Sequence, residues 1–305
     1  MLSTVKAETM SQPAALERFL HEDLEPAPPG SVFVGAGDCF SASLITGCLS
    51  QRGHLAVDPY ELITSPAIAR GRSVYFVSTS GRTASNIAAA AAVEAVARER
   101  VAVTADPAGG LARMTDSVIF IPYRNAPRVP GTLSFSLSLL ALMKIVQGGF
   151  KCDFKGAYSK ARRDAVKVGL AENGVSYFLG NGPAYPVCIY AALKVHEMLG
   201  GRAQGIMLEE FGHAPIFALR KEDTVNIFGA FDSLDLGQRL APPLLKAGFS
   251  SSVIPPFGSD PHERVFHLVF LSQLAVLERA KSMGLSRPYF AAASDRLAIS
   301  DKMIY

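Results

Sequence analysis

The chain has 305 residues, of which 49% are hydrophobic and 19% are charged, and its formal net charge is +3 at pH 7. This length is sufficient for two domains with a hydrophobic core each, and the composition excludes a largely disordered protein. Because the lysines and arginines are scattered and the net charge is small, we expect no nucleic-acid partner.

The longest apolar stretch, 133–146, contains three serines. It is shorter than the about 20 residues that span a bilayer, so it predicts a core helix. No basic segment followed by an apolar one opens the chain. We therefore expect no signal peptide, no membrane association and a cytoplasmic location. No CxxC spacing occurs among the cysteines, which predicts buried thiols and no metal site; these cysteines are Cys39, Cys48, Cys152 and Cys188.

Strand-like and helix-like runs alternate along the whole chain. The first half contains predicted strands at 32–34, 74–77, 101–103 and 118–121, and predicted helices at 41–51, 84–98 and 133–146. The second half contains predicted strands at 177–179, 224–228 and 253–254, and predicted helices at 188–200, 235–247 and 262–283. This alternation predicts an α/β fold in which each half is a doubly wound parallel sheet flanked by helices.

The pattern is interrupted by glycines and a polar stretch at 148–156, which predicts two domains, 1–150 and 151–305. A Gly-x-Gly sequence ends the first predicted strand of each half, at 35–37 and 180–182, and the two copies lie about 145 residues apart. That spacing indicates a duplicated domain. Nicotinamide binding is a weaker alternative, because Phe40 replaces the third small residue of the dinucleotide motif while Asp58 lies near the distance of a ribose-binding carboxylate.

The hexapeptide Ser78-Thr79-Ser80-Gly81-Arg82-Thr83 joins a buried strand to an alanine-rich helix. A helix start offers unpaired N–H groups and the positive end of the helix dipole, both of which attract anions. A single hydroxyl is enough for an ordinary helix cap. The hexapeptide has four hydroxyls, and this surplus predicts a phosphate-binding loop.

The second half contains a group of ionisable residues in two segments. Lys194 and Glu197 lie one helical turn apart, so their side chains can point to the same side. Glu209, Glu210 and His213 follow in the next predicted segment. A carboxylate and an imidazole suit proton transfer on a phosphorylated small molecule. A simple ion pair of Lys194 with Glu197, and a structural role for His213, remain open alternatives.

These motifs resemble the tandem sugar isomerase (SIS) proteins, especially the isomerase half of glucosamine-6-phosphate synthase and related sugar-phosphate deaminases and isomerases. The resemblance covers both halves and rests on four segments: 6–13, 78–83, 179–197 and 208–215. It implies two tandem domains of flavodoxin-like fold and a 6-phosphosugar substrate. It also implies a homodimer with shared active sites, and a reaction that requires no metal or organic cofactor.

The resemblance also implies roles for individual residues. The implied phosphate ligands are Ser78, Thr79, Ser80 and Thr83, with Cys39 as a further substrate contact. The implied catalytic residues are Glu197 as the proton-transfer base, Lys194 beside it, His213 as the ring-opening residue from a neighbouring subunit, and Lys302 as the tail lysine that meets the open-chain carbonyl. The chain departs from the family at three positions: Cys39 replaces a serine, Thr79 replaces a glutamine, and Tyr190 replaces a residue that is often glutamate.

A second branch of the family has a segment similar to Ala126-Pro127-Arg128, in which the arginine helps to stabilise an enediolate. Arg128 is therefore a further candidate substrate contact. No glutaminase segment precedes the first domain, so we expect that the chain by itself cannot release ammonia from glutamine. The predicted function is isomerising deamination of glucosamine 6-phosphate, or amination of fructose 6-phosphate with ammonia from another source. The alternatives are a phosphoglucose or phosphomannose isomerase, and a sugar-phosphate sensor without catalysis.

Overall fold

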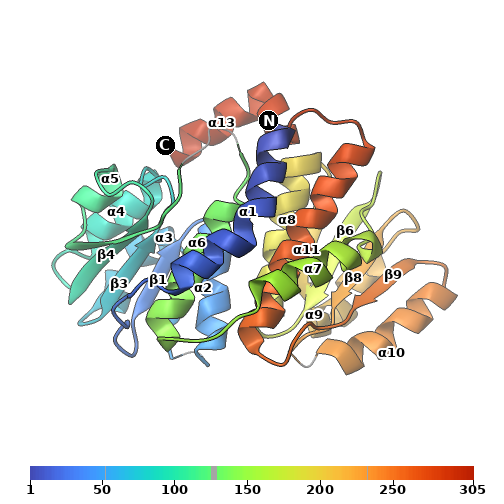
Figure 1. Cartoon of the computed structure of the whole chain (residues 1–305), viewed down its shortest axis with the longest axis horizontal. Helices are drawn as coiled ribbons and strands as arrows, with labels where there is room; N and C mark the ends of the chain where they lie inside the picture. The colour runs from blue at the N-terminus through green and yellow to red at the C-terminus, as the bar shows by residue number, and fades with distance from the viewer. Residues whose placement is uncertain (52, 125–128, 232) are drawn as a thin grey trace. The chain divides into compact units, whose positions relative to one another are not determined.

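The computed structural model describes residues 1–51, 53–124, 129–231 and 233–305, which form two parallel β-sheets with helices on both faces (Figure 1). The chain divides into two compact units. The five-stranded unit consists of Ala15–Pro127, Gly131–Lys151 and Ser294–Tyr305, and the four-stranded unit of Met1–Ala14, Arg128–Pro130 and Cys152–Ala293. Helix α1 (Leu2–Leu20) contributes residues to both units.

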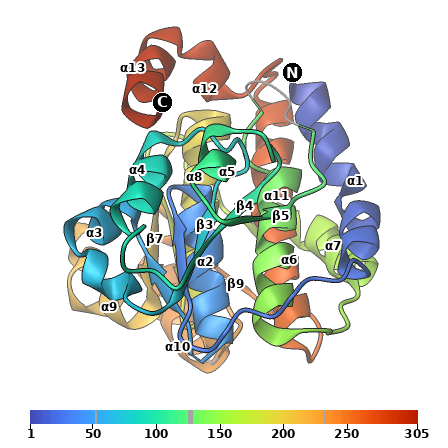
Figure 2. The ribbon, with the colours of Figure 1, turned by 90° about the vertical axis from the view of Figure 1, so that its left-hand side faces the viewer.

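All strands of the five-stranded unit are parallel, in the order β2-β1-β3-β4-β5. The strands are β1 (Val32–Gly35), β2 (Leu55–Val57), β3 (Ser73–Val77), β4 (Glu99–Thr104) and β5 (Ser117–Phe120). The helices are α2 (Asp38–Leu49), α3 (Pro59–Thr64), α4 (Ala84–Ala92), α5 (Gly110–Arg113), α6 (Leu133–Gln147) and α13 (Ser294–Ile304), with a short 3-10 helix at Pro66–Ala69. Helices α2 and α6 pack together over one face of the sheet, and α3 and α4 cover the other face (Figure 2).

The burial of the central strands follows from these two layers. Every residue of β1 and of β3 is buried, as expected for parallel strands that are covered on both faces. Val74 and Phe76 of β3 pack in the core beneath α3, α4 and α5, and Tyr75 between them faces the opposite side of the sheet. The two faces of β3 therefore belong to two different layers.

The four-stranded unit repeats this arrangement with the strand order β7-β6-β8-β9. The strands are β6 (Val175–Gly180), β7 (Arg202–Met207), β8 (Thr224–Phe228) and β9 (Ser250–Ile254). The helices are α7 (Phe154–Asp164), α8 (Ala184–Leu199), α9 (Leu208–His213), α10 (Ser233–Lys246), α11 (Pro261–Ser282) and α12 (Tyr289–Ala292), with 3-10 helices at Ala165–Lys167 and Pro215–Ala218. Helices α7, α8 and α11 pack against one another, while α9 and α10 contribute to the core on the other face of the sheet.

The predicted α/β fold with two parallel, helix-flanked sheets is confirmed. Some elements differ from the prediction. The helix expected at 84–98 ends at Ala92, because the following residues turn and Ala97 forms an isolated bridge with Arg70 before β4 begins. Strands β2 and β7, which the prediction omits, each form one of the two edges of their sheet. The predicted core helix at 133–146 is α6, and nearly all of its residues are buried.

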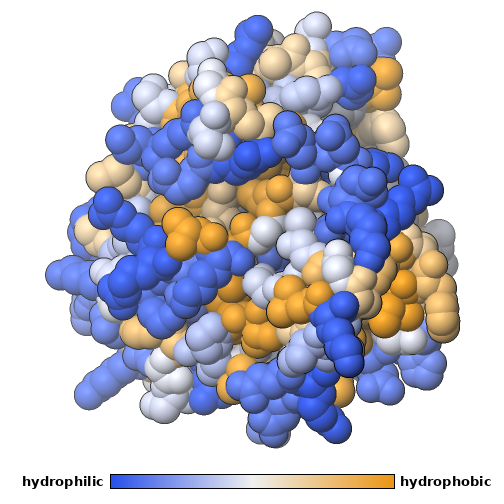
Figure 3. Space-filling view, turned by 90° about the vertical axis from the view of Figure 1, so that its right-hand side faces the viewer, coloured by the Kyte–Doolittle hydropathy of each residue, from blue (hydrophilic) through white to orange (hydrophobic). Residues whose placement is uncertain are grey.

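None of the helices described in the structure has both the length and the hydropathy that are required to cross a membrane. Large apolar side chains are exposed at several positions of the four-stranded unit, including Val166, Phe217 and Leu245. Figure 3 shows one face of the molecule, on which hydrophobic residues lie in several patches divided by hydrophilic ones. Scattered apolar surface of this kind is usual for folded proteins and does not by itself indicate a binding face.

Candidate active site

The hydroxyl-rich hexapeptide follows β3 in the five-stranded unit and is held in place by the main chain and by Asn86. The N–H of Gly81 donates to the carbonyl oxygen of Ser78 at 3.0 Å, and the N–H of Leu111 donates to the carbonyl oxygen of Gly81 at 2.9 Å. Asn86 Nδ2 in α4 donates to the carbonyl oxygen of Val77 at 2.8 Å. These bonds fix the hexapeptide between β3, α4 and α5, so the backbone that bears its hydroxyls is held in one conformation.

Glycine is required at position 81 for two reasons. The residue has a φ of +63°, in the left-handed region that side chains other than glycine rarely adopt. A Cβ atom there would also lie 3.0 Å from Oγ1 of Thr104. The glycine therefore permits the tight turn that directs the chain from β3 into α4.

Two hydroxyls of the hexapeptide lie together at the start of α4, whereas Oγ1 of Thr79 lies 3.4 Å from Oγ of Ser138 in α6. Oγ of Ser78 and Oγ1 of Thr83 lie 3.0 Å apart, and Oγ of Ser80 accepts a bond from the N–H of Arg82 at 3.3 Å. Thr83 occupies the N-cap position of α4, yet its side chain makes no capping bond. The first-turn N–H groups of α4 thus lack a side-chain cap, and they provide a set of donors suited to an anion.

Arg82 was not singled out from the sequence, although it lies inside the hexapeptide. Its side chain is exposed, and its guanidinium carbon lies 5.5 Å from the ring centroid of Tyr305 at the end of α13. A guanidinium binds a phosphate group through paired donors. Arg82 is therefore a further candidate phosphate contact. Its positive charge within a hydroxyl-rich loop is the sequence signal that could have identified it.

Cys39 lies in the first turn of α2, which follows β1. Strands β1 and β3 are neighbours, with Gly35 paired to Val77, so the turn that contains Cys39 and the hexapeptide start from adjacent strand ends. Helix α2 then crosses one face of the sheet and α4 the other (Figure 2). Open parallel sheets bind their ligands at such a switch point, beyond the carboxyl ends of the strands.

Lys302 lies on α13, an element that the sequence analysis did not predict. The helix has no buried residue, and Lys302 is exposed. The contact of Arg82 with Tyr305 joins the end of this helix to the hexapeptide within the five-stranded unit. Lys302 thus belongs to the same unit as the predicted phosphate ligands, three residues before the tyrosine that contacts Arg82.

Lys194 and Glu197 of α8 form an ion pair in the four-stranded unit, in which Nζ of Lys194 donates to Oε2 of Glu197. The lysine side chain is 0% exposed and the glutamate side chain is 34% exposed. Nζ of Lys194 also lies 4.9 Å from the ring centroid of Tyr190, one turn earlier on the helix. Glu197 is consequently a partly exposed carboxylate that a buried ammonium group holds in one orientation.

Behind this pair lies a buried network that reaches α1. Nε2 of Gln273 in α11 donates to the hydroxyl of Tyr190 at 2.9 Å, and Nε2 of Gln12 donates to Oε1 of Gln273. Gln12 is fully buried, which gives the end of the segment 6–13 a structural role. The network supports Tyr190 and, through it, the position of Lys194.

His213 is the last residue of α9, and its side chain is 70% exposed. Its Nε2 lies 3.6 Å from Oε1 of Glu209, one turn earlier on the same helix. The imidazole is therefore accessible to solvent and has a carboxylate beside it. Arg128, the remaining predicted contact, lies outside the residues that the structure describes.

Among the described residues, no three His, Cys, Asp or Glu side chains lie together in a group that could hold a metal ion. The groups available for chemistry are those already described: hydroxyls, N–H groups and a guanidinium in one unit, and an oriented carboxylate and an exposed imidazole in the other. Such groups can bind a phosphate and transfer protons.

No protein-family model matches this sequence. Among curated proteins, the chain is similar to glutamine–fructose-6-phosphate aminotransferase (isomerizing) of Pyrobaculum aerophilum, with 26% identity over 254 residues, which is 75% of this chain and 41% of that protein. The chain spans between 30% and 41% of the length of the curated relatives it matches. The similarity therefore concerns only a part of each of those proteins.

Solved structures match over nearly the whole chain. Glucosamine-6-phosphate deaminase of Thermotoga maritima has a TM-score of 0.76 at 21% identity, covering 92% of this chain and 95% of that one. Tagatose-6-phosphate ketose/aldose isomerase of Escherichia coli has a TM-score of 0.71 at 18% identity, covering 94% and 96%. The C-terminal domain of glucosamine-fructose-6-phosphate aminotransferase of Francisella tularensis has a TM-score of 0.68 at 15% identity, covering 90% and 93%. The chain shares the fold of these phosphosugar enzymes.

Proposed function

We propose that this protein is a phosphosugar aldose-ketose isomerase of the amino-sugar branch, and that it converts glucosamine 6-phosphate and water into fructose 6-phosphate and ammonia. The observation on which this proposal chiefly rests is the hexapeptide 78–83, a rigid, hydroxyl-rich turn before a helix without a side-chain cap. The names of the similar proteins support the choice of a phosphorylated sugar as substrate.

In this proposal the hexapeptide binds the 6-phosphate. The hydroxyls of Ser78, Ser80 and Thr83 and the first N–H groups of α4 donate to the phosphate oxygens, and Arg82 adds a positive charge. A phosphate held at one end of the sugar fixes the position of the carbons at the other end. Binding energy from a part of the substrate that does not react thereby contributes orientation at C1 and C2.

Glu197 is the proposed base that moves a proton between C1 and C2. It meets two requirements for this task, because its carboxylate is partly exposed and the buried Lys194 fixes its orientation. His213 is the proposed ring-opening residue, and its exposed imidazole is free to meet a sugar bound to a neighbouring subunit. The proton transfer produces an imine when the substrate carries a 2-amino group, and water then releases ammonia.

The first experiment compares four reactions with the purified protein. The substrates are glucosamine 6-phosphate, fructose 6-phosphate with ammonia, glucose 6-phosphate and mannose 6-phosphate. The proposal predicts ammonia and fructose 6-phosphate from the first substrate. Turnover of glucose or mannose 6-phosphate alone indicates the plain isomerase, and saturable binding without any turnover indicates a sensor; either result contradicts the proposal.

The second experiment tests the base. Glu197→Gln keeps the shape of the side chain but removes the carboxylate, so we expect exchange of the C2 proton with heavy water to stop while substrate binding remains within a few-fold of wild type. Glu222→Gln is the matched control, because Glu222 is an exposed glutamate of the same unit. Exchange that persists in Glu197→Gln transfers the role to another carboxylate, with Glu209 and Glu210 tested next.

A further inference from the structure

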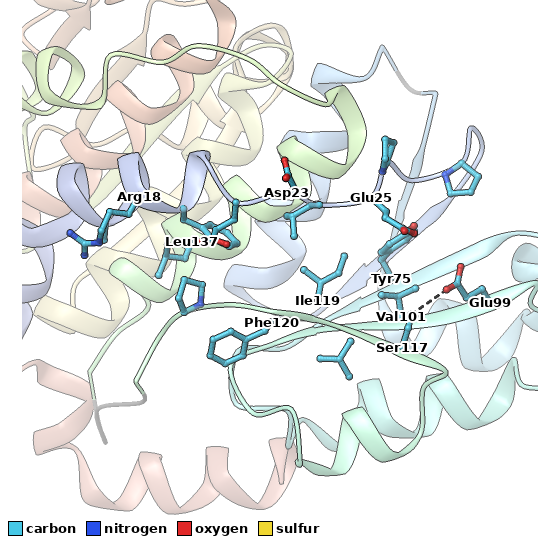
Figure 4. A pocket seen from close by; sticks show the side chains of 18 of the residues that line it. Arg18, Asp23, Glu25, Tyr75, Glu99, Val101, Ser117, Ile119, Phe120 and Leu137 are labelled. Atoms are coloured by element: carbon cyan, nitrogen blue, oxygen red, sulfur yellow. Dashed lines mark hydrogen bonds between the residues drawn. The ribbon is translucent and has the colours of Figure 1, made fainter.

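A pocket with a volume of about 840 Å³ lies in the five-stranded unit. It is open between two walls. One wall is the end of α1 and the segment that follows it, residues 15–28, and the other consists of β3, β4 and β5 (Figure 4). None of the candidate active-site residues lines this pocket. Its volume falls in the range of pockets that bind small organic molecules.

The floor of the pocket is apolar. Tyr75 of β3 and Val101 of β4 are paired in register and face it, and Ile119 of β5 and Leu137 of α6 extend the apolar surface (Figure 4). Phe19 and Leu24 contribute from the opposite wall. Tyr75, Val101 and Leu137 are already almost fully buried by the protein, whereas Val118 and Phe120, which also line the pocket, are exposed. A ligand with an apolar body can therefore remove the side chains of Val118 and Phe120 from water.

Two carboxylates stand at one end of the floor, on either side of Tyr75. Glu25 comes from the segment after α1, and Glu99 comes from the start of β4, where Oγ of Ser117 donates to its Oε1 at 3.1 Å (Figure 4). Burial raises the pKa of the Tyr75 hydroxyl to about 12, and the negative charges of Glu99 and Glu25 contribute to the rise. This end of the pocket is therefore an environment of negative potential.

Negative side chains outnumber positive ones in the lining of the pocket. The lining contains four carboxylates, those of Glu22, Asp23, Glu25 and Glu99, against the two guanidinium groups of Arg18 and Arg98. Arg18 lies at the opposite end of the pocket from Glu25 and Glu99 (Figure 4). The pocket thus offers an apolar floor with an excess of negative charge at one end.

The wall that contains Glu25 is fixed to the rest of the unit. Nζ of Lys144 in α6 donates to the carbonyl oxygens of Phe19 and Leu20, each at 2.8 Å, and to that of Glu22. The N–H of Ala27 donates to the carbonyl oxygen of Ile145. These bonds anchor the segment on both sides of Glu25, so the pocket is formed before any ligand arrives.

We propose that this pocket binds an organic cation with an apolar body. Its ammonium group lies between Glu25 and Glu99, with the Tyr75 hydroxyl as a further acceptor, and its apolar body covers Ile119 and the exposed side chains of Val118 and Phe120. The match of charge to these carboxylates distinguishes this ligand from a neutral apolar molecule and from an acid of the same size.

The test uses 3-phenylpropylamine as the probe, with 3-phenylpropanol and 3-phenylpropionate as the neutral and anionic analogues. Isoleucine methyl groups are labelled for NMR, so that the Ile119 signal reports on the pocket and the Ile227 signal, from the core of the other unit, serves as a reference. We expect a saturable shift of Ile119 with the amine and an affinity at least tenfold lower for both analogues. Binding of the amine should also weaken as the salt concentration rises.

Glu25→Gln and Glu99→Gln should each weaken binding of the amine about tenfold, because each removes one charged partner. Glu61→Gln is the control, since Glu61 is exposed in the same unit and does not line the pocket. Equal binding of the three probes, or unchanged affinity in both pocket variants, overturns the proposal. So does an Ile119 signal that shifts with protein concentration in the absence of a probe, because a second copy of the chain then covers the pocket.

Discussion

His267, a fully buried histidine of α11, predicts a loss of stability in mild acid. His267 is 0% exposed, and its Nε2 lies 3.2 Å from Oδ2 of Asp164. Asp164 is also buried and pairs with both Lys160 and Lys167. Burial lowers the pKa of His267 from 6.5 to about 4, a change that the neighbouring Asp164 opposes and the two lysines reinforce.

The sign and the size of the effect follow from this pKa. The folded protein keeps His267 neutral at a pH where the unfolded chain binds a proton, so acid favours unfolding below pH 6.5. Above pH 6.5, His267 makes its full contribution to the free energy of unfolding. This contribution falls by about 2 kcal/mol when the pH is lowered to 5, and by about 3 kcal/mol in total once the pH is below 4. The pKa of Asp164 is lowered from 3.8, so its own loss begins only in stronger acid.

The assay is urea unfolding of the wild type and of His267→Gln at pH 7 and pH 5. Glutamine retains an N–H donor for Asp164 but does not titrate in this range. His54 is also a buried histidine with a lowered pKa, and it remains in both proteins, so the difference between the two pH dependences isolates His267. We expect wild type to lose about 2 kcal/mol more than His267→Gln between these pH values. Equal losses in the two proteins would refute the reasoning.

Three further predictions concern the candidate site. The double variant Ser80→Ala, Thr83→Ala should raise the KM for the phosphosugar at least tenfold, about 1.4 kcal/mol, because donors to the phosphate are lost; unchanged steady-state kinetics would remove the hexapeptide from the site. Mixing inactive Glu197→Gln and His213→Ala subunits should restore part of the activity if His213 serves a neighbouring subunit, and activity in the mixture no higher than in the separate variants would contradict that role. Deleting 300–305 should abolish turnover and leave the melting temperature nearly unchanged, since α13 has no buried residue; full activity after the deletion would exclude Lys302.

Hydrophobicity identified the strands that are buried on both faces and also two edge strands, β5 and β9, which contain short apolar runs. Strand β3 is fully buried, and its sequence Ser73-Val74-Tyr75-Phe76-Val77 is a continuous apolar run after the first serine. Strands β2 and β7 lie at sheet edges, and most of their residues are partly or fully exposed. Because edge positions impose little burial, sequences such as Arg202–Met207 give no periodic signal, and only pairing with β6 defines that strand.

The types of residue in the candidate site could be read from the sequence. Their burial and the orientation of their side chains could not. The hydroxyl content of 78–83 predicts a phosphate-binding loop, which stays a prediction, and the three-residue spacing of Lys194 and Glu197 left open the ion pair that the structure shows. The sequence could not show that Lys194 is completely buried, because its burial depends on α11 packing against α8. Nor could it show that Thr83 leaves α4 uncapped, because that depends on the orientation of one side chain.

The two sheets also explain why we assign phosphate binding to only one of them. In the four-stranded unit, the loop after β8 corresponds in topology to the hexapeptide after β3. Its serine, Ser233, is fully buried and accepts a bond from the N–H of Asn181 at 2.9 Å, so the hydroxyl already has a partner. The same loop contains Phe231, which lies near the turn at Gly182, where an added Cβ would be 3.6 Å from the Cβ of Phe231. The loop after β8 thus differs from the hexapeptide, and we therefore propose the anion site at the hexapeptide alone, with Glu197 of the four-stranded unit as the proposed base.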